Sequence, residues 1–472
     1  MKWDVVVVGS GPNGLAAAVA LAQKGASVLV LEGRDTIGGG TRTQELTLPG
    51  FHHDVCSAAH PMGVLSPFLR SLPLEEHGLT WSTGSASFAH PLPDQPAVVV
   101  TRSLEETMRD LGEDGERYRR LLAPYLKNPH GFLADALAPL RLPRHPLLLA
   151  RFGLNAVRSA VGLAQARFRG QRARALLAGC AAHSLLPLDK PLSAAVGLMF
   201  ALTAHIEQWP VATGGSAAIA RALAGYLGTL GGRIETGRMV SSMDDLPASS
   251  VVLFDTSPDQ LASIAGDALP SRYRRRLGRY RYGPGTFKLD WALDGPIPWT
   301  DTRVNGASTV HCGGPLEEVA AAERAPWEGR VAERPFVLLV QQSELDRSRA
   351  PQGKHTGYGY CHVPAGWDGD ATEAIEAQVE RFAPGFRDRI LARAASSPQD
   401  LHAHNPNYVG GAIAGGVADL MQLFFRPVAR LDPYSTPNPR LFLCSASTPP
   451  GGGVHGMCGY WAARSAARRL TF

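Results

Sequence analysis

The chain has 472 residues, of which 44% are hydrophobic and 19% are charged, and its formal net charge is +5. This composition is typical of a globular protein and excludes a disordered or fibrous chain. The length exceeds one ordinary hydrophobic core and predicts two or three lobes. The six cysteines form neither a C-x-x-C pair nor a metal-ligand spacing, so we expect no disulfide framework and no bound metal.

No apolar run in the sequence reaches the length of a membrane-spanning helix. The first strand that we predict begins at residue 4, which leaves no space for a signal peptide. The sparse cysteines suit a reducing compartment. We therefore expect a cytoplasmic protein.

The chain opens with a strand, a turn and a helix in the order that a dinucleotide site requires. The four valines of residues 5–8 predict a buried parallel strand, and an Ala-rich helix follows over residues 15–24. A second apolar run, residues 28–31, ends in Glu32, whose carboxylate would accept hydrogen bonds from a ribose diol. An acid at this position disfavours the 2′-phosphate of NADP.

A G-x-G-x-x-G turn joins the first strand to the helix. Gly9 permits the tight turn, Gly11 lets the backbone approach a diphosphate, and Gly14 lets the helix pack closely on the strand. Pro12 and Asn13 lie inside the turn, where the helix N-terminus would face the phosphates. The pattern predicts a Rossmann-like α/β fold with a bound dinucleotide.

The stretch after Glu32 favours FAD over NAD. It resembles the E-x-R-x-x-x-G-G extension of glutathione-reductase-type flavoproteins, and its cofactor candidates are Gly33, Arg34, Gly39, Gly40, Thr41 and Arg42. Consecutive glycines permit backbone contact with an extended ribityl-diphosphate chain. The two arginines would offer charge to a phosphate or stack near the adenine.

The next part of the chain predicts the start of a second lobe. Residues 79–101 indicate strands around a proline-rich turn. The capping-box pattern of Ser103 and Glu106 then predicts a helix that runs towards Lys127.

A stretch without acidic residues follows. Between Ala136 and Leu188 there is no Asp or Glu, whereas eight arginines are interleaved with leucines and phenylalanines. One interpretation is a basic amphipathic surface that lies on anionic lipid and admits an apolar substrate. The other is a helical lid packed on its own protein, with its arginines solvated or paired elsewhere. Sparse aromatic residues and the lack of a recognisable module argue against nucleic-acid binding.

Near residue 210 the pattern indicates a return to the dinucleotide domain. A helix is predicted after Ser216. Arg238–Val240 resembles the strand of such flavoproteins whose backbone lies beside the adenine, which makes Val240 a cofactor candidate. Further strands, assigned to the second lobe, are predicted at residues 287–293, 336–341 and 357–363.

The end of the chain supplies an independent match to a flavin site. Residues 439–463 read as a strand, a Pro/Gly turn and a helix, and they resemble the C-terminal flavin motif of phytoene-desaturase-like and amine-oxidase-like flavoproteins. In that family the helix N-terminus points at the flavin pyrimidine edge, where reduction places negative charge. The resemblance makes cofactor candidates of Ser445, Gly453, Val454 and Met457. Family members commonly carry glycine at the position of Ser445, whose hydroxyl can still donate a hydrogen bond.

Further blocks, beginning at Pro49, Trp209, Tyr360 and His404, extend the resemblance to bacterial phytoene-dehydrogenase-like proteins over most of the chain. It implies a glutathione-reductase/amine-oxidase-type FAD domain, interleaved with an α+β substrate domain and a helical lid. We assign the FAD domain to residues 1–75, 210–262 and 402–472. The substrate domain takes residues 76–135 and 263–401, and the basic helical lid or membrane-facing region takes residues 136–209.

The resemblance implies noncovalent FAD and hydride transfer from a substrate C–H bond to flavin N5. A second dinucleotide fingerprint is missing from the sequence, which favours a flavin reduced by the substrate and reoxidised by dioxygen or a quinone. We therefore expect a desaturase or oxidase that acts on a small apolar substrate, such as an isoprenoid or secondary metabolite. The alternatives are a flavin amine oxidase, with Lys288 as its lysine, and a redox-neutral double-bond isomerase. We expect no nucleic acid partner, and peripheral contact with the inner face of the membrane follows from the lipid interpretation.

Three residues are our candidates for catalysis. His455 lies in the C-terminal turn, where it either bonds the flavin or substrate or faces away and caps a helix. His60 follows the FAD segment, and Trp461 would wall the flavin face, although both residue types more often serve the core. His183 and His205 border the arginine-rich stretch and are further candidates for the cavity wall.

Overall fold

The protein is described by a computed structural model that covers residues 2–470. Its first layer is a five-stranded parallel sheet in the order β16-β10-β1-β2-β9. The strands are β1 (Trp3–Val8), β2 (Val28–Leu31), β9 (Arg233–Glu235), β10 (Ser249–Phe254) and β16 (Leu441–Leu443). All five come from the three intervals assigned to the FAD domain.

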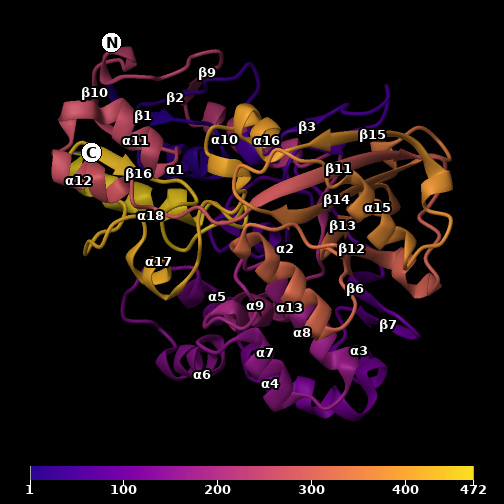
Figure 1. The fold of residues 1–472 in the computed structure, drawn as a ribbon. Coiled ribbons are helices and arrows are strands. Elements are labelled where there is room, and N and C mark those ends of the chain that lie inside the picture. The colour runs from indigo at the N-terminus through magenta and orange to yellow at the C-terminus, as the bar shows by residue number, and fades with distance from the viewer. Residues whose placement is uncertain (1, 471–472) are drawn as a thin grey trace.

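Helices cover both faces of this sheet, as Figure 1 shows. Val5 and Val7 face a cluster formed with α1 (Pro12–Ala22), α10 (Ala217–Thr229) and α18 (Met457–Ala466). Val6 and Val8 face α11 (Pro258–Ala265) and α12 (Ser271–Leu277). Burial on both faces explains why the first strand is an unbroken run of valines. The mixed α/β fold with a Rossmann-like layer confirms the predicted fold class.

The second layer is a seven-stranded mixed sheet in the order β15-β11-β14-β13-β12-β6-β7. The pairing of β6 with β12 is parallel and the other pairings are antiparallel. The strands are β6 (Ala86–Leu92), β7 (Gln95–Val100), β11 (Gly285–Leu293), β12 (Ala307–Cys312), β13 (Val337–Val340), β14 (His355–Val363) and β15 (Ile390–Ser396). All seven fall in the intervals assigned to the substrate domain.

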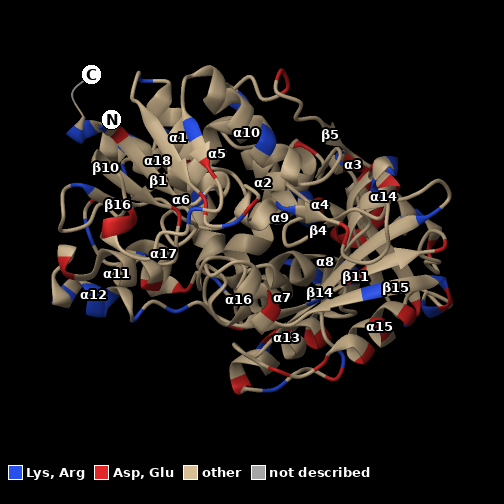
Figure 2. Cartoon of the chain, turned by 90° about the horizontal axis from the view of Figure 1, so that it is seen from above, with Lys and Arg blue, Asp and Glu red and all other residues tan. Residues whose placement is uncertain are grey.

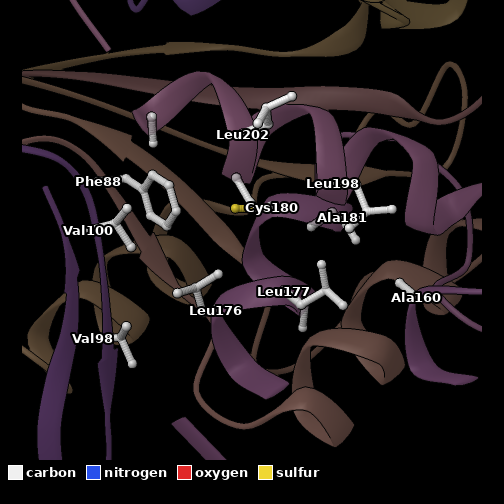
Figure 3. Packing of buried hydrophobic residues seen from close by; sticks show 14 of the residues in the cluster. Phe88, Val98, Val100, Ala160, Leu176, Leu177, Cys180, Ala181, Leu198 and Leu202 are labelled. Carbon is white, nitrogen blue, oxygen red and sulfur yellow. The ribbon is translucent and has the colours of Figure 1, made fainter. Parts of the chain in front are cut away.

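Helices also pack on both faces of the second sheet. One face packs on α15 (Thr372–Glu380), in a cluster that includes Trp291 and Phe386. The other face packs on α8 (Gln171–Ala182) and α9 (Ser193–Ile206), which are thereby core helices. Figure 3 shows Leu176 and Cys180 of α8 beside Phe88 and Val100 of the sheet. Much of residues 136–209, which we predicted as a basic helical lid or membrane-facing region, is therefore interior.

Two sequence predictions about local structure were wrong. The helix expected over residues 103–127 is broken at Gly112, whose φ is +59°. It forms α3 (Leu104–Leu111), whose N-cap Ser103 accepts the N–H of Glu106, and α4 (Gly115–Leu126). Residues 238–240 are not a strand, because β9 ends at Glu235.

Short helices and strands complete the described chain. The remaining helices are α2 (Pro61–Val64), α5 (Pro129–Ala136), α6 (Pro146–Ala156), α7 (Ala160–Arg167), α13 (Leu316–Arg324), α14 (Gln342–Leu345), α16 (Pro398–His404) and α17 (Leu420–Phe425). Two small antiparallel pairs join β3 (Thr43–Gln44) to β4 (His53–Asp54) and β5 (Trp81–Ser82) to the distant β8 (Val211–Ala212). Within residues 2–470 no single helix has the length and apolarity to cross a membrane, although the bent pair α6 and α7 meets that test jointly.

Candidate active site

One cavity of about 800 Å³ begins at the carboxyl ends of β1, β2 and β10 and extends between the two sheets and α9. The carboxyl edge of a parallel sheet is where open α/β folds bind their ligands. The cavity wall includes all of our cofactor candidates except Gly14 and Met457. It brings together the N-terminal turn, the glycine stretch, Val240 and the C-terminal turn, which are far apart in sequence.

The glycine turn leaves no space for side chains. Gly9 has a φ of +97°, and a Cβ at Gly11 would lie 2.5 Å from Oδ2 of Asp255. A Cβ at Gly14 would overlap the backbone oxygen of Gly9, so this glycine serves the contact between helix and strand. Gly11 caps α1 without a side-chain hydrogen bond, which leaves the positive end of the helix facing the cavity.

Glu32 is buried and already bonded within the protein. Its Oε2 accepts the N–H of Ser10 at 3.0 Å, and its Oε1 accepts the N–H of Arg34 at 2.9 Å. Arg42 forms an ion pair with Oε1 at 3.2 Å and donates to the carbonyl of Thr36 at 2.8 Å. Arg42, which we expected near a phosphate or the adenine, therefore holds Glu32 in place.

Asp255 is a site residue that the sequence reasoning missed. It follows β10, lines the cavity, and accepts the N–H of Gly14 at 2.9 Å. Burial raises the pKa of Asp255 to about 7, and the nearby charge of Glu32 acts in the same direction. The signal in the sequence was the position of Asp255 directly after a run of apolar residues.

Asn405–Tyr408 also line the cavity, and the Tyr408 hydroxyl fills the space where Gly40 would carry a Cβ.

The C-terminal turn forms another part of the cavity wall, and its end lies against α1. Gly453 has a φ of +134° and Val454 a φ of +54°, so the turn presents backbone to the cavity. His455 lines the cavity, and its Nδ1 accepts the N–H of Met457 at 3.0 Å at the start of α18. Burial lowers the pKa of His455 to about 4, so its imidazole is neutral. His455 thus caps the helix, but it lines the cavity and does not face away from it.

The other two catalytic candidates do not line the cavity. His60 is fully buried, and its Nε2 shares a hydrogen bond of 2.8 Å with the hydroxyl of Ser216. Trp461 donates to the carbonyl of Leu137 at 3.0 Å and stacks on Arg141, which places it behind the cavity mouth. His205 bonds the Tyr118 hydroxyl at 2.9 Å, also away from the cavity. His183 does line it.

An inner chamber of the cavity lies between α9 and the seven-stranded sheet. Its wall includes His183, Val196, Met199, Phe200, Trp209, Thr309, Leu338, Val340, Tyr358 and Tyr360. His183 packs on Phe200 with ring centroids 4.5 Å apart, and its Nε2 lies 2.9 Å from Nε2 of His311. Burial lowers the pKa of His183 to about 3, so the pair is neutral.

Lys288, the lysine considered for amine oxidation, lies behind this chamber. It is buried and paired with Asp290, and its ammonium lies 4.6 Å from the ring centroid of Tyr358. It is not part of the cavity wall. Neighbouring buried charges, such as Arg349 with Asp54 at 2.6 Å, form part of the same polar region.

The dinucleotide end of the cavity fits FAD, because its wall offers hydrogen-bond donors and its glycines leave space. In the first turn of α1, Pro12 has no N–H and Gly14 donates to Asp255, so Asn13 provides the backbone N–H for a diphosphate. The glycines leave room for a chain that runs close to the backbone. Oδ1 of Asn13 is buried on the cavity wall without a hydrogen-bond partner among the described residues. An unpartnered polar atom at a cofactor site is typical of a ligand contact. Fold and site together define a Rossmann-type, dinucleotide-dependent oxidoreductase.

Comparisons with known proteins agree with this class. Residues 7–72 match the family model described as NAD(P)-binding Rossmann-like domain. Pyridine nucleotide-disulfide oxidoreductase domain-containing protein 2 of Rattus norvegicus is 27% identical over 99% of this chain and 94% of its own. A neurosporene-forming phytoene desaturase of Rhodobacter capsulatus is 26% identical over 96% of this chain and 91% of its own.

A solved structure extends the fold comparison. A triple mutant of putrescine oxidase superposes with a TM-score of 0.63 at 18% identity, covering 99% of this chain and 98% of that one. At this identity the likeness concerns the fold. The chain is a flavin-type oxidoreductase similar in sequence to phytoene desaturases, and its cofactor is FAD.

Proposed function

We propose that this oxidoreductase dehydrogenates an apolar substrate in the inner chamber and that dioxygen or a quinone reoxidises the cofactor. The observation that carries the proposal is the chamber itself, which is continuous with the dinucleotide end of the cavity. Its wall is formed by aliphatic, aromatic and histidine side chains and one threonine, without a carboxylate among its described residues. A cationic amine would find no counter-charge there, whereas an isoprenoid or similar hydrocarbon would match the wall.

The buried lysine supports dehydrogenation of a hydrocarbon over amine oxidation. Lys288 is held by Asp290 and the ring of Tyr358, so its proton donors are directed within the protein. A role as the water-holding lysine of an amine oxidase would place it on the cavity wall. Amine oxidation is therefore the second candidate, to be tested with the same titration.

FAD, when bound, supplies the two-electron acceptor that takes a hydride from a substrate C–H bond. Loss of a neighbouring proton then completes a C=C or C=N bond. In the tautomer in which Nε2 of His183 donates to Nε2 of His311, Nδ1 of His183 is a free base. A buried neutral imidazole of low pKa is a weak base, and it suffices here because hydride loss makes the adjacent C–H strongly acidic.

The test is an anaerobic titration of the purified yellow protein with candidate polyenes, terpenes, amines and NADH. Bleaching by a polyene or terpene, with recovery in air or with a quinone, is the expected result. Bleaching by amines alone would replace the proposal with amine oxidation. Bleaching by NADH alone would replace it with a reductase or isomerase reaction.

A blocked chamber provides the matched control. Val196→Trp places a large ring on the chamber wall and should abolish bleaching by the apolar substrate while the flavin spectrum stays unchanged. Leu391→Trp adds the same ring at an exposed position of β15 and should have no effect. Equal bleaching in both variants would mean that the substrate binds elsewhere.

A further inference from the structure

The mouth of the cavity is surrounded by exposed apolar side chains. Two short helices, α6 and α17, border it together with the loops 137–143 and 430–433. They lie on the same side of the molecule in both Figure 1 and Figure 2, although about 270 residues separate them in sequence. An apolar rim around a ligand cavity is unusual on a protein that meets only water.

Helix α6 is apolar on two opposite sides. Leu149 and Phe152 point inward, where they line the cavity. Leu147 and Leu154 point outward and keep 86% and 76% of their surface exposed. The solvent-facing side of a surface helix is normally polar, so the exposed leucines of α6 indicate contact with an apolar partner. Leu142, in the preceding loop, is 94% exposed.

Helix α17 repeats this arrangement from the other end of the chain. Leu423 packs inward beside the cavity, whereas Leu420, Met421 and Phe425 are exposed on the outside. Leu431, in the following loop, is fully exposed and also lines the mouth. Apolar residues from both segments thus surround the same opening.

The charges on the α6 side of this rim are positive. The acids beside α17, Asp419 and Asp432, are paired with Arg281 and Arg468. Residues 136–188 contain no acid, and Arg144 and Arg151 are exposed within and beside α6. Other arginines of the stretch are engaged within the protein: Arg172 pairs with Asp110 at 2.6 Å, and Arg141 lies 3.7 Å from Asp135 and stacks on Trp461. The arginines of the stretch therefore fall into two groups, one engaged within the protein and one exposed. Leucines projecting among free arginines match an anionic lipid surface in both polarity and charge.

We propose that α6, α17 and their adjoining loops form a docking surface for an anionic lipid bilayer. We call it the mouth surface and define it by Leu142, Leu147, Leu154, Leu420, Met421 and Leu431. Its leucines enter the boundary between headgroups and acyl chains, while Arg144 and Arg151 contact lipid phosphates. The cavity then opens into the apolar part of the bilayer. That an apolar substrate enters by this route rests on the proposed function, whereas the docking itself does not.

The experiment is co-sedimentation of the FAD-loaded protein with phosphatidylcholine vesicles, with and without phosphatidylglycerol. Binding is expected with the anionic vesicles and should weaken as salt is added. We expect two double variants to weaken binding by about tenfold or more. Arg144→Ser/Arg151→Ser removes two basic residues, each of which contributes roughly fivefold near such a surface. Leu147→Ser/Leu154→Ser removes the apolar side chains that enter the bilayer.

Matched controls come from other exposed positions. The arginines of α12 form a second basic group on the outer edge beside α11 (Figure 2), and Arg275→Ser/Arg276→Ser removes the same charge there. Leu391→Ser removes an exposed leucine from β15. Both controls should bind as the parent protein does. An equal loss in the α12 variant would overturn the proposal in favour of unspecific charge attraction, and unchanged binding of the mouth variants would also overturn it.

A site-specific probe tests directly whether α6 enters the bilayer. All six native cysteines are buried, so Leu154→Cys introduces one accessible thiol for an environment-sensitive dye. The dye should shift to the blue on addition of anionic vesicles, whereas the same dye at Leu391→Cys should not shift. The unchanged flavin spectrum reports that each variant is folded. Loss of vesicle binding with intact substrate bleaching in detergent would leave the proposed function standing, so the two ideas fail separately.

Discussion

The dinucleotide end of the cavity and the mouth surface differ in how much space surrounds each side chain. At the dinucleotide end, a single added methyl group at Gly14 would overlap the backbone of Gly9. At the mouth, Leu142 keeps 94% of its surface exposed. Close backbone contact restricts the residue type and therefore leaves a readable sequence pattern. An exposed leucine leaves no such pattern, because its role depends on the molecule that covers it and not on neighbouring residues in the sequence.

The largest effect in this comparison is expected from Gly14→Ala. The new Cβ meets a backbone oxygen that cannot rotate away, so α1 must move from the sheet, at a cost of about 1–3 kcal/mol or more. We expect loss of FAD and a clearly lower melting temperature, measured by flavin absorbance and thermal unfolding. Gly228→Ala on the exposed side of α10 meets no atom within 4 Å and should stabilise the protein slightly. A yellow, fully stable Gly14→Ala protein would contradict the structure.

Between the two ends, His183→Gln tests the proposed proton acceptor. The glutamine keeps a polar group beside His311 but removes the basic nitrogen, so turnover with an apolar substrate should fall about a hundredfold. FAD content should not change. His205→Gln, which alters a buried histidine outside the cavity, is the control. Turnover that falls equally in both variants would indicate a structural effect.

Asp255→Asn tests the buried acid at the dinucleotide end through pH. Because burial raises the folded-state pKa of Asp255 to about 7, the folded protein holds a proton that the unfolded chain releases above about pH 4. Asp255 should therefore make the free energy of unfolding fall as pH rises from about 4 to 7. The asparagine variant, which still accepts the N–H of Gly14, should lack this component in chemical unfolding series. Parallel pH profiles of the two proteins would show that Asp255 is ionised in the fold.

The smallest expected effect is a difference in stability between two variants of the arginine-rich stretch, one at a paired arginine and one at an exposed arginine. Arg172→Ser loses an ion pair with Asp110 and a hydrogen bond of 3.0 Å to the carbonyl of Ala97, which should cost about 1 kcal/mol of stability. Arg144→Ser should change stability by less than about 0.5 kcal/mol, because its side chain is exposed. Chemical unfolding distinguishes the two. A larger loss for Arg144 would place it in the protein's own packing and weaken the case for lipid contact.

The sequence was sufficient to predict the parts of the fold that depend on local pattern. The run β1-α1-β2, the glycine turn and the C-terminal turn all appear where they were expected, because each needs particular residues at short spacing. Asp255 was missed because its function depends on Gly11 and Gly14, about 240 residues earlier in the chain. The six-residue helix α17 is too short to show a periodicity. The partner of Trp461 is Leu137, which only the tertiary fold brings close.

The first and last helices of the chain lie in direct contact. A Cβ at Gly459 in α18 would overlap the backbone oxygen of Asn13 in α1, and β16 completes the five-stranded sheet. During synthesis, the nascent chain therefore holds an incomplete sheet with an open edge at β10 until β16 emerges. Such pairings of distant segments fold slowly and leave aggregation-prone surfaces exposed. A chain that ends before residue 441 lacks both β16 and the α18 wall, so we expect it to be insoluble and colourless.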